Sequence, residues 1–388
     1  MNGVIRGSAI FSFRVAVGIL AFAVLLGSCG TGEHDGLSEE PRVIPVTAAD
    51  YDARIKLSGR QLLEDVQLPD DVALGPLALL PEGGVVVGDA EAGSVFFITE
   101  NASVSQPIRF GLGADEMQSV KAIDVGSDRI YVYGYGGVGA FAKLIELDMR
   151  GGFLRSDNVT VPAATDVAFA GDRLISAATI LPASQVANLG MDAYRALGDH
   201  DLAVRIYTDA YGNEELYRFH SRFNTMVQTP ASAHLFTGFF LIDSHGERIW
   251  VTNKQYNYLY AYNYEGSPLL RLHFNDSRYP PKDYSTQEGT HTYGYNSAVA
   301  VDEHGLVFLS KGGRPLPEDL GQFNFYRIDV VSKTGELLAI MEVDSRADFI
   351  DVWGGTLIAA PYAGDSVVAY DYSPYLQEWI ERGSDEGQ

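Results

Sequence analysis

The segment LYAYNYEGSPLL (Leu259–Leu270) carries the pattern on which the architecture depends. An apolar, alternating run is followed by Asn263, a short turn with Gly266, and a second apolar run. Period-two alternation on both sides of turn-forming residues predicts a β-hairpin. The pattern recurs as LIELDMRGGFL (Leu144–Leu154), IYTDAYGNEELY (Ile206–Tyr217), FYRIDVVSKTGELL (Phe325–Leu338), a truncated VVAYDYSP (Val367–Pro374) and a weaker VFFITENASVS (Val95–Ser105).

A second kind of hairpin precedes each of these. Examples are LALLPEGGVVVGD (Leu77–Asp89) and IDVWGGTLIAA (Ile350–Ala360). Together the two hairpins make a four-stranded antiparallel unit, and six units fill Pro76 to Tyr372. A single four-stranded unit would leave both faces of its sheet exposed to water, so the units must pack against one another. Packing around a common axis makes a propeller. We expect an all-β, six-bladed β-propeller; a β-sandwich pair or a seven-bladed ring with a degenerate blade are the alternatives.

The sixth unit stops after its third strand, so another part of the chain must complete it. Arg42–Val46 or Ala53–Leu57 could supply the missing strand and remove an open sheet edge. Residues 180–200 interrupt the third blade and predict one or two short helices, with Gly190 and Gly198 as stops. The propeller is expected over residues 42–375, followed by a polar acidic tail over residues 376–388.

The blade count and hairpin signature resemble the TolB-like and NHL-like six-bladed propellers, in particular lipoprotein-type propellers of environmental and gut bacteria. The resemblance covers nearly all of residues 42–375 and rests on no catalytic motif. It implies the fold; most members of that group are binding or scaffold modules, and a minority are hydrolases and lyases.

The amino terminus predicts export and lipidation. Arg6 and Arg14 precede an apolar run, Val15–Leu26. The run is short for a membrane span but suits the apolar region of a signal peptide. Leu-Gly-Ser-Cys follows and resembles the bacterial lipobox, with Cys29 as the acylated residue; an ordinary signal peptide or an uncleaved anchor helix is the alternative. We expect a signal peptide over residues 1–28, a flexible tether over residues 29–41, and a chain lipid-anchored in the cell envelope, with the outer membrane possible.

Composition narrows the function further. The formal net charge of −23 repels phosphate backbones, so nucleic acid is not an expected partner. Cys29 is the only cysteine, so no intramolecular disulfide can form. The eight histidines have no zinc spacing, and we find no nucleotide-binding or nucleophile motif. No metal or other cofactor is therefore expected.

Antiparallel order predicts where a ligand binds. In a blade of strands a to d, the b–c and blade-to-blade loops emerge on one face, the loop face; the a–b and c–d turns emerge on the other, the turn face. Long insertions gather on the loop face, which we expect to hold the ligand site. The candidate residues there are His234, Asn253, Lys254, Tyr256, Asn296, Lys311, Arg314, Tyr362 and Tyr135.

Lys254, Lys311 and Arg314 at one mouth would favour an anionic or carbonyl-rich ligand, unless they pair with acidic residues at the same rim. The leading hypothesis is a non-catalytic envelope protein that binds a peptide, glycan or protein. One alternative is a divalent-cation-dependent lactonase- or lyase-type hydrolase, which needs at least three oxygen ligands converging at the central channel. The other is a subunit of an envelope complex with a large exposed apolar patch.

Overall fold

A computed structural model describes residues 41–64, 66, 68–69, 72–136, 141–159, 166–170, 173–179, 201–207, 215–222, 240–254, 256–265, 267–276, 284–286, 289–291, 296–311, 326–362 and 364–384. The helical insertion expected at residues 180–200, the lipobox and the tether up to residue 40 lie outside these residues. No helix in the described ranges is long and apolar enough to cross a membrane.

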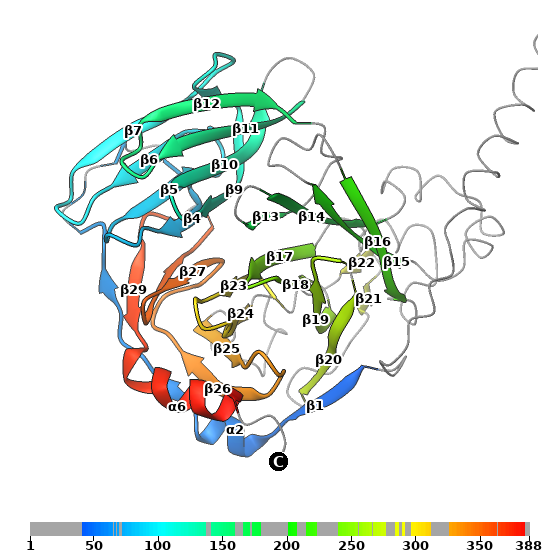
Figure 1. Cartoon of the computed structure of the whole chain (residues 1–388). Helices are drawn as coiled ribbons and strands as arrows, with labels where there is room; N and C mark the ends of the chain where they lie inside the picture. Colours follow the sequence, from blue (N-terminus) through cyan, green and yellow to red (C-terminus); the bar gives the residue numbers. More distant parts are fainter. Residues whose placement is uncertain are drawn as a thin grey trace, which may run out of the picture. The chain divides into compact units, whose positions relative to one another are not determined.

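Within the described ranges, six sheets each contain four antiparallel strands, which are the blades of the propeller, and three of these sheets carry a fifth strand in parallel (Figure 1). Blade 1 holds β4 (Leu74–Leu79), β5 (Val85–Asp89), β6 (Val95–Ile98) and β7 (Val104–Phe110). Blade 2 holds β9 (Ser119–Val125), β10 (Arg129–Gly136), β11 (Phe141–Asp148) and β12 (Phe153–Asn158). Blade 3 holds β13 (Val167–Ala170), β14 (Arg173–Thr179), β15 (Asp201–Tyr207) and β16 (Glu215–Arg222). A short β8 (Glu116–Met117) pairs in parallel with β7.

Blades 4 to 6 complete the ring. Blade 4 holds β17 (Phe240–His245), β18 (Arg248–Asn253), β19 (Tyr256–Asn263) and β20 (Pro268–Asp276). Blade 5 holds β23 (Ala298–Val301), β24 (Val307–Lys311), β25 (Arg327–Val331) and β26 (Leu337–Glu342). Blade 6 holds β27 (Phe349–Trp353), β28 (Thr356–Ala360) and β29 (Val368–Asp371), together with β3 (Arg60–Gln61). The hairpin of β21 (Tyr284–Thr286) and β22 (Gly289–His291) is a separate two-stranded sheet.

Packing between blades closes the ring. The innermost strands contact one another in an unbroken cycle, β4–β9–β13–β17–β23–β27–β4. Six clusters of buried apolar side chains were identified among the described residues, and each lies between two neighbouring blades. Each sheet hides its two faces against its neighbours, so burial of apolar area stabilises the ring as a whole rather than any single blade. The fold class expected from the sequence is confirmed.

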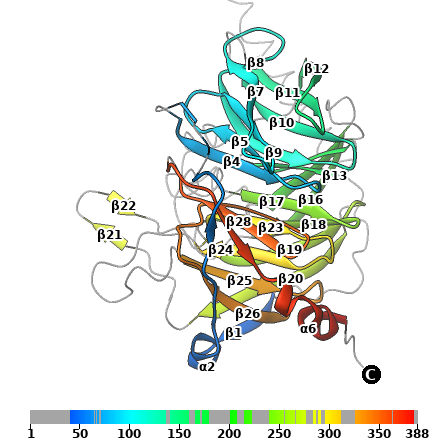
Figure 2. The same ribbon diagram turned by 90° about the vertical axis from the view of Figure 1, so that its left-hand side faces the viewer.

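The N-terminal strap, Arg42–Gln61, runs along the outer edges of blades 4, 5 and 6 (Figure 2). β1 (Arg42–Val46) adds to β20 and β2 (Ile55–Lys56) adds to β26, both in parallel, as fifth strands. β3 pairs antiparallel with β29 and is the missing fourth strand of blade 6. The ring closes through the amino-terminal part of the chain, as expected. The expectation that Arg42–Val46 or Ala53–Leu57 supplies the closing strand was wrong. Those segments pair instead with the open edges of β20 and β26, and β3, the strand that directly precedes blade 1, occupies the closing position.

Two helices flank the strands in the described part of the chain. The short α2 (Ala48–Asp52) begins with a capping box of Thr47 and Asp50. The second, α6 (Ser373–Ser384), occupies much of the segment expected to be a polar acidic tail. Trp379 is buried in the cluster between blades 5 and 6, stacked on Tyr372 and Tyr375. The apolar stripe of the segment anchors it despite its charged residues.

Candidate functional site

A narrow channel of about 150 Å³ runs between the innermost strands. Four aspartates line it: Asp124 on β9, Asp166 just before β13, Asp243 on β17 and Asp351 on β27. The channel has room for a few water molecules and is smaller than an ordinary small-molecule site, which occupies about 300–1,000 Å³.

Each of the four carboxylates links two blades. Each carboxylate accepts the backbone N–H of the residue that follows it in the chain and a second N–H from the inner strand of the next blade. The interblade bonds are Phe169 N–H to Asp124 at 2.8 Å, Ile242 N–H to Asp166 at 3.1 Å, Val301 N–H to Asp243 at 2.7 Å and Leu79 N–H to Asp351 at 2.6 Å. These bonds join blades 2 to 3, 3 to 4, 4 to 5 and 6 to 1. We call the four side chains the aspartate clasps.

Burial shapes the acidity of the aspartate clasps. Desolvation raises the pKa of Asp166 and of Asp351 to about 7. Burial also raises the pKa of Asp243, and the nearby charges of Asp124 and Asp351 raise it further. No three His, Cys, Asp or Glu side chains in the described ranges are grouped so that they could hold a metal ion. The hydrogen bonds given above make the clasps interblade acceptors.

One residue of the expected loop-face site, Lys254, lines this channel, and two others are described elsewhere in the structure. Lys254 is exposed and lines the channel, where its charge lowers the pKa of Asp166 against the larger effect of burial. Tyr135 is half-buried, with the Lys121 ammonium 5.9 Å from its ring centre. Tyr362 is 58% exposed and its N–H donates to Asp348 at 2.9 Å. Their role in ligand binding stays a prediction.

Three other candidates lie together inside the protein. The Nζ of Lys311 donates to Asn296 and to Asn257, both at 2.9 Å, and lies 3.4 Å from Asp329. The Nδ2 of Asn296 donates to the Asn253 carbonyl at 3.0 Å. Burial lowers the pKa of Lys311, and the carboxylate of Asp329 opposes that effect. These contacts give all three a structural role between blades 4 and 5; a ligand-binding role for them stays a prediction.

The same buried network continues to the N-terminal strap. Arg327 donates to both oxygens of Asp329, at 2.6 and 2.8 Å, and to Asp276 at 2.7 Å. It also donates to the hydroxyl of Tyr51 on α2, which in turn donates to Asp276 at 2.5 Å. Two cations and two carboxylates are thus neutralised together, and α2 is fixed over the seam between blades 4 and 5.

The remaining candidates lie outside what the structure describes. His234 and Arg314 are not among the described residues, and only the backbone of Tyr256 is described, at the start of β19. Most of the loop-face insertions fall in the same gaps. These expectations stay predictions.

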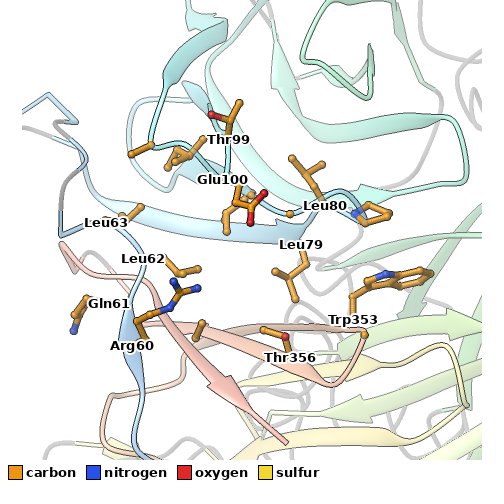
Figure 3. Close-up of a pocket in the computed structure, with 18 of the residues that line it drawn as sticks. Arg60, Gln61, Leu62, Leu63, Leu79, Leu80, Thr99, Glu100, Trp353 and Thr356 are labelled. Atoms are coloured by element: carbon orange, nitrogen blue, oxygen red, sulfur yellow. The ribbon is translucent and has the colours of Figure 1, made fainter. Parts of the chain in front are cut away.

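A larger cavity, which sequence reasoning missed, lies at the seam between blades 6 and 1 (Figure 3). This seam pocket has a volume of about 610 Å³, within the range of small-molecule sites. It is lined by the a–b turns of both blades, the c–d turn of blade 1, and the chain from β3 onward. It therefore belongs to the turn face. The lining residues used below are Arg60, Gln61, Glu64, Glu100, Trp353 and Thr356.

The polar side chains of the seam pocket are open to a ligand. The side chains of Arg60 and Glu100 extend toward the space between the two blades (Figure 3). Within the described part of the chain, none of Arg60, Gln61, Glu64, Glu100 and Thr356 has a side-chain hydrogen bond or ion pair with another described residue. Trp353 is 44% exposed. The sequence signal was the Trp-Gly-Gly turn, where a large aromatic residue occupies a position that needs only a turn former.

Comparisons with known proteins concern the fold of the chain. No protein-family model matches the chain, and no curated protein matches it. Among solved structures it is similar to a Bacteroides fragilis protein whose name describes it as exported (12% identity, TM-score 0.50, covering 85% of this chain and 99% of that one). It is also similar to virginiamycin B lyase from Staphylococcus aureus (11%, TM-score 0.46, 81% and 98%) and to a gluconolactonase from Xanthomonas campestris (14%, TM-score 0.42, 84% and 93%). At 12% identity the likeness to the Bacteroides fragilis protein shows the fold alone, and the six sheets packed in an unbroken cycle make the chain a β-propeller.

Proposed function

We propose that the chain is a lipid-anchored, extracytoplasmic binding protein whose ligand site is the seam pocket. The anchoring half rests on the signal-peptide pattern and the lipobox that ends at Cys29. The binding half rests on the one observation that carries it: a cavity of ligand size whose polar side chains have no partner among the described residues and whose rim holds an exposed tryptophan.

Unpaired polar groups and an exposed indole favour binding because each gains free energy when a ligand covers it. An indole that is 44% exposed keeps apolar area in water, and contact with a ligand removes it. The backbone of these residues is already held on turns and a paired strand, so the ordering cost of binding is confined to their side chains. The ligand classes that fit are those expected from the sequence: a peptide, a glycan or a segment of a partner protein.

The alternative is a divalent-cation-dependent hydrolase with its site in the channel. Its oxygen ligands would have to come from the aspartate clasps, since these are the carboxylates that line the described channel. Each clasp already accepts backbone N–H groups from two positions, and a cation would compete with those interblade bonds. Binding at the seam pocket is therefore the function that we propose.

A ligand panel tests the binding half. The full chain in detergent is heated with neutral trisaccharides, acidic sugars and tripeptides, one class at a time, and its Tm is measured. A ligand at roughly 100 times its Kd adds about 2.7 kcal/mol to the free energy of unfolding, and hence several degrees to the Tm. We expect at least one class to raise the Tm, and Trp353→Ala to abolish the rise.

The matched control is Phe153→Ala, because Phe153 is also 44% exposed but lies at the start of β12, away from the seam. This variant should keep the full shift. A rise in Tm that survives Trp353→Ala would place the ligand elsewhere and contradict the proposal.

A further inference from the structure

We propose that the ligand of the seam pocket is a short, neutral oligosaccharide. This inference deepens the proposed function and depends on it. It commits to one of the three ligand classes, and it follows from the charge of the pocket, the hydrogen-bonding capacity of its side chains and the shape of Trp353.

The charge of the pocket selects against ionic ligands. Arg60 faces the same cavity as Glu64 and Glu100, and the protein carries a formal charge of −23. An anion would meet two carboxylates and the field of an acidic protein. A cation would be attracted by the two carboxylates, but repulsion from the guanidinium of Arg60 would offset part of that attraction. A ligand without net charge avoids both penalties.

The hydrogen-bonding groups match hydroxyls. Arg60 can only donate and ionised Glu100 can only accept, whereas Gln61 and Thr356 can do both. A sugar hydroxyl donates one hydrogen bond and accepts others, so neighbouring hydroxyls on one ring can satisfy donors and acceptors together. The backbone of an extended peptide instead presents its groups at a fixed repeat and is best bound by a long open strand edge. β3, the strand at this seam, has two residues.

Trp353 supplies the apolar surface. It stands at the end of β27 next to Gly354 and Gly355, whose φ values of +59° and +78° suit glycine and let the chain reverse within a tight turn. The indole is flat, and one face of a pyranose ring presents C–H groups in a nearly flat array. Stacking the two removes apolar area from water while the hydroxyl edge remains free for Arg60 and Glu100.

The fluorescence of the protein offers a direct test. The chain has three tryptophans, and Trp250 and Trp379 are each 1% exposed. Acrylamide, a neutral quencher, should therefore act mainly on Trp353. We expect a saturable loss of quenching when maltotriose, cellotriose or xylotriose is titrated into the full chain, and little change with trialanine.

Variants decide whether the signal comes from this site. Trp353→Phe should remove the quenchable emission while leaving the buried emission. Glu100→Gln keeps the shape of the side chain but removes its charge, and should weaken trisaccharide binding about tenfold. Phe153→Ala should bind normally.

Two results would overturn the inference, and they are distinguishable from failure of the proposed function. Protection of Trp353 by trialanine and by none of the three sugars would keep the seam pocket as a binding site and refute the sugar. Protection by none of the probes, together with a Tm shift that survives Trp353→Ala, would refute both.

Discussion

Replacing Arg327 with methionine should destabilise the seam between blades 4 and 5 more than a substitution on the surface does. The side chain is 2% exposed, and it neutralises Asp329 and Asp276, which are equally buried. Methionine fills similar space along the stem but leaves the carboxylates facing an apolar group. Breaking a buried ion pair by removing one partner costs about 3–5 kcal/mol.

The structure also indicates how that cost divides. Asp329 would keep Lys311, whose Nζ lies 3.4 Å away, and would retain part of its stabilisation. Asp276 would lose the guanidinium and keep its hydrogen bond from the hydroxyl of Tyr51. Since Tyr51 also loses the cation over its ring, at 4.9 Å, α2 should detach from the blades before the ring opens.

Urea unfolding followed by circular dichroism measures the effect. With a slope of about 3 kcal/mol per molar urea, the midpoint of Arg327→Met should fall by roughly 1–2 M. Arg155→Met is the matched control, because Arg155 forms an exposed pair with Asp157 that is worth at most about 1 kcal/mol. A midpoint for Arg327→Met within error of that for Arg155→Met would refute the reasoning.

Three further predictions concern other parts of the chain. Trp379→Ala removes the buried side chain of α6 and should cost about 3–5 kcal/mol in urea unfolding by circular dichroism; a loss below about 1 kcal/mol would show that α6 does not hold blades 5 and 6. Burial raises the pKa of Asp351 to about 7 from 3.8, so the folded state binds this proton more tightly than the unfolded state does. The resulting contribution to the free energy of unfolding is full below about pH 4 and is lost as the pH rises to about 7. Asp351→Asn should therefore flatten the dependence of the unfolding free energy on pH between about 4 and 7, and an unchanged profile would contradict the raised pKa. Cys29→Ser should abolish labelling by palmitate in cells and release the protein from membranes, and continued labelling would exclude Cys29 as the acylated residue.

The blades were predictable because hairpin patterns are local. The run Leu259–Leu270 alternates and turns within twelve residues, and the structure has β19 and β20 on either side of that turn. The number of blades followed from counting such runs. Which edge a short strand joins is not local, and Arg42–Val46 has the same alternation whether it becomes a fourth strand or a fifth. The α6 helix had a visible stripe of Leu376, Trp379 and Gly383, but its acidic composition suggested a tail.

The ligand site was harder to predict, because topology places a residue on a face without showing where its side chain points. Lys311 ends β24, near the loop face, yet all five residues of that strand are buried, and its side chain lies inside the seam between blades 4 and 5. Trp353 was passed over because its turn belongs to the face without insertions. The seam pocket also needs β3, a two-residue strand that no pattern of alternation can reveal.

The central claim is that the turn-face seam between blades 6 and 1 binds the ligand of this propeller. A crystal structure of the protein with whichever member of the panel raises its Tm most tests that claim directly. The account predicts ligand density against the indole of Trp353, within reach of Arg60 and Glu100. Density over the loop-face mouth of the channel, beside Lys254, with the seam pocket holding only water, would contradict it.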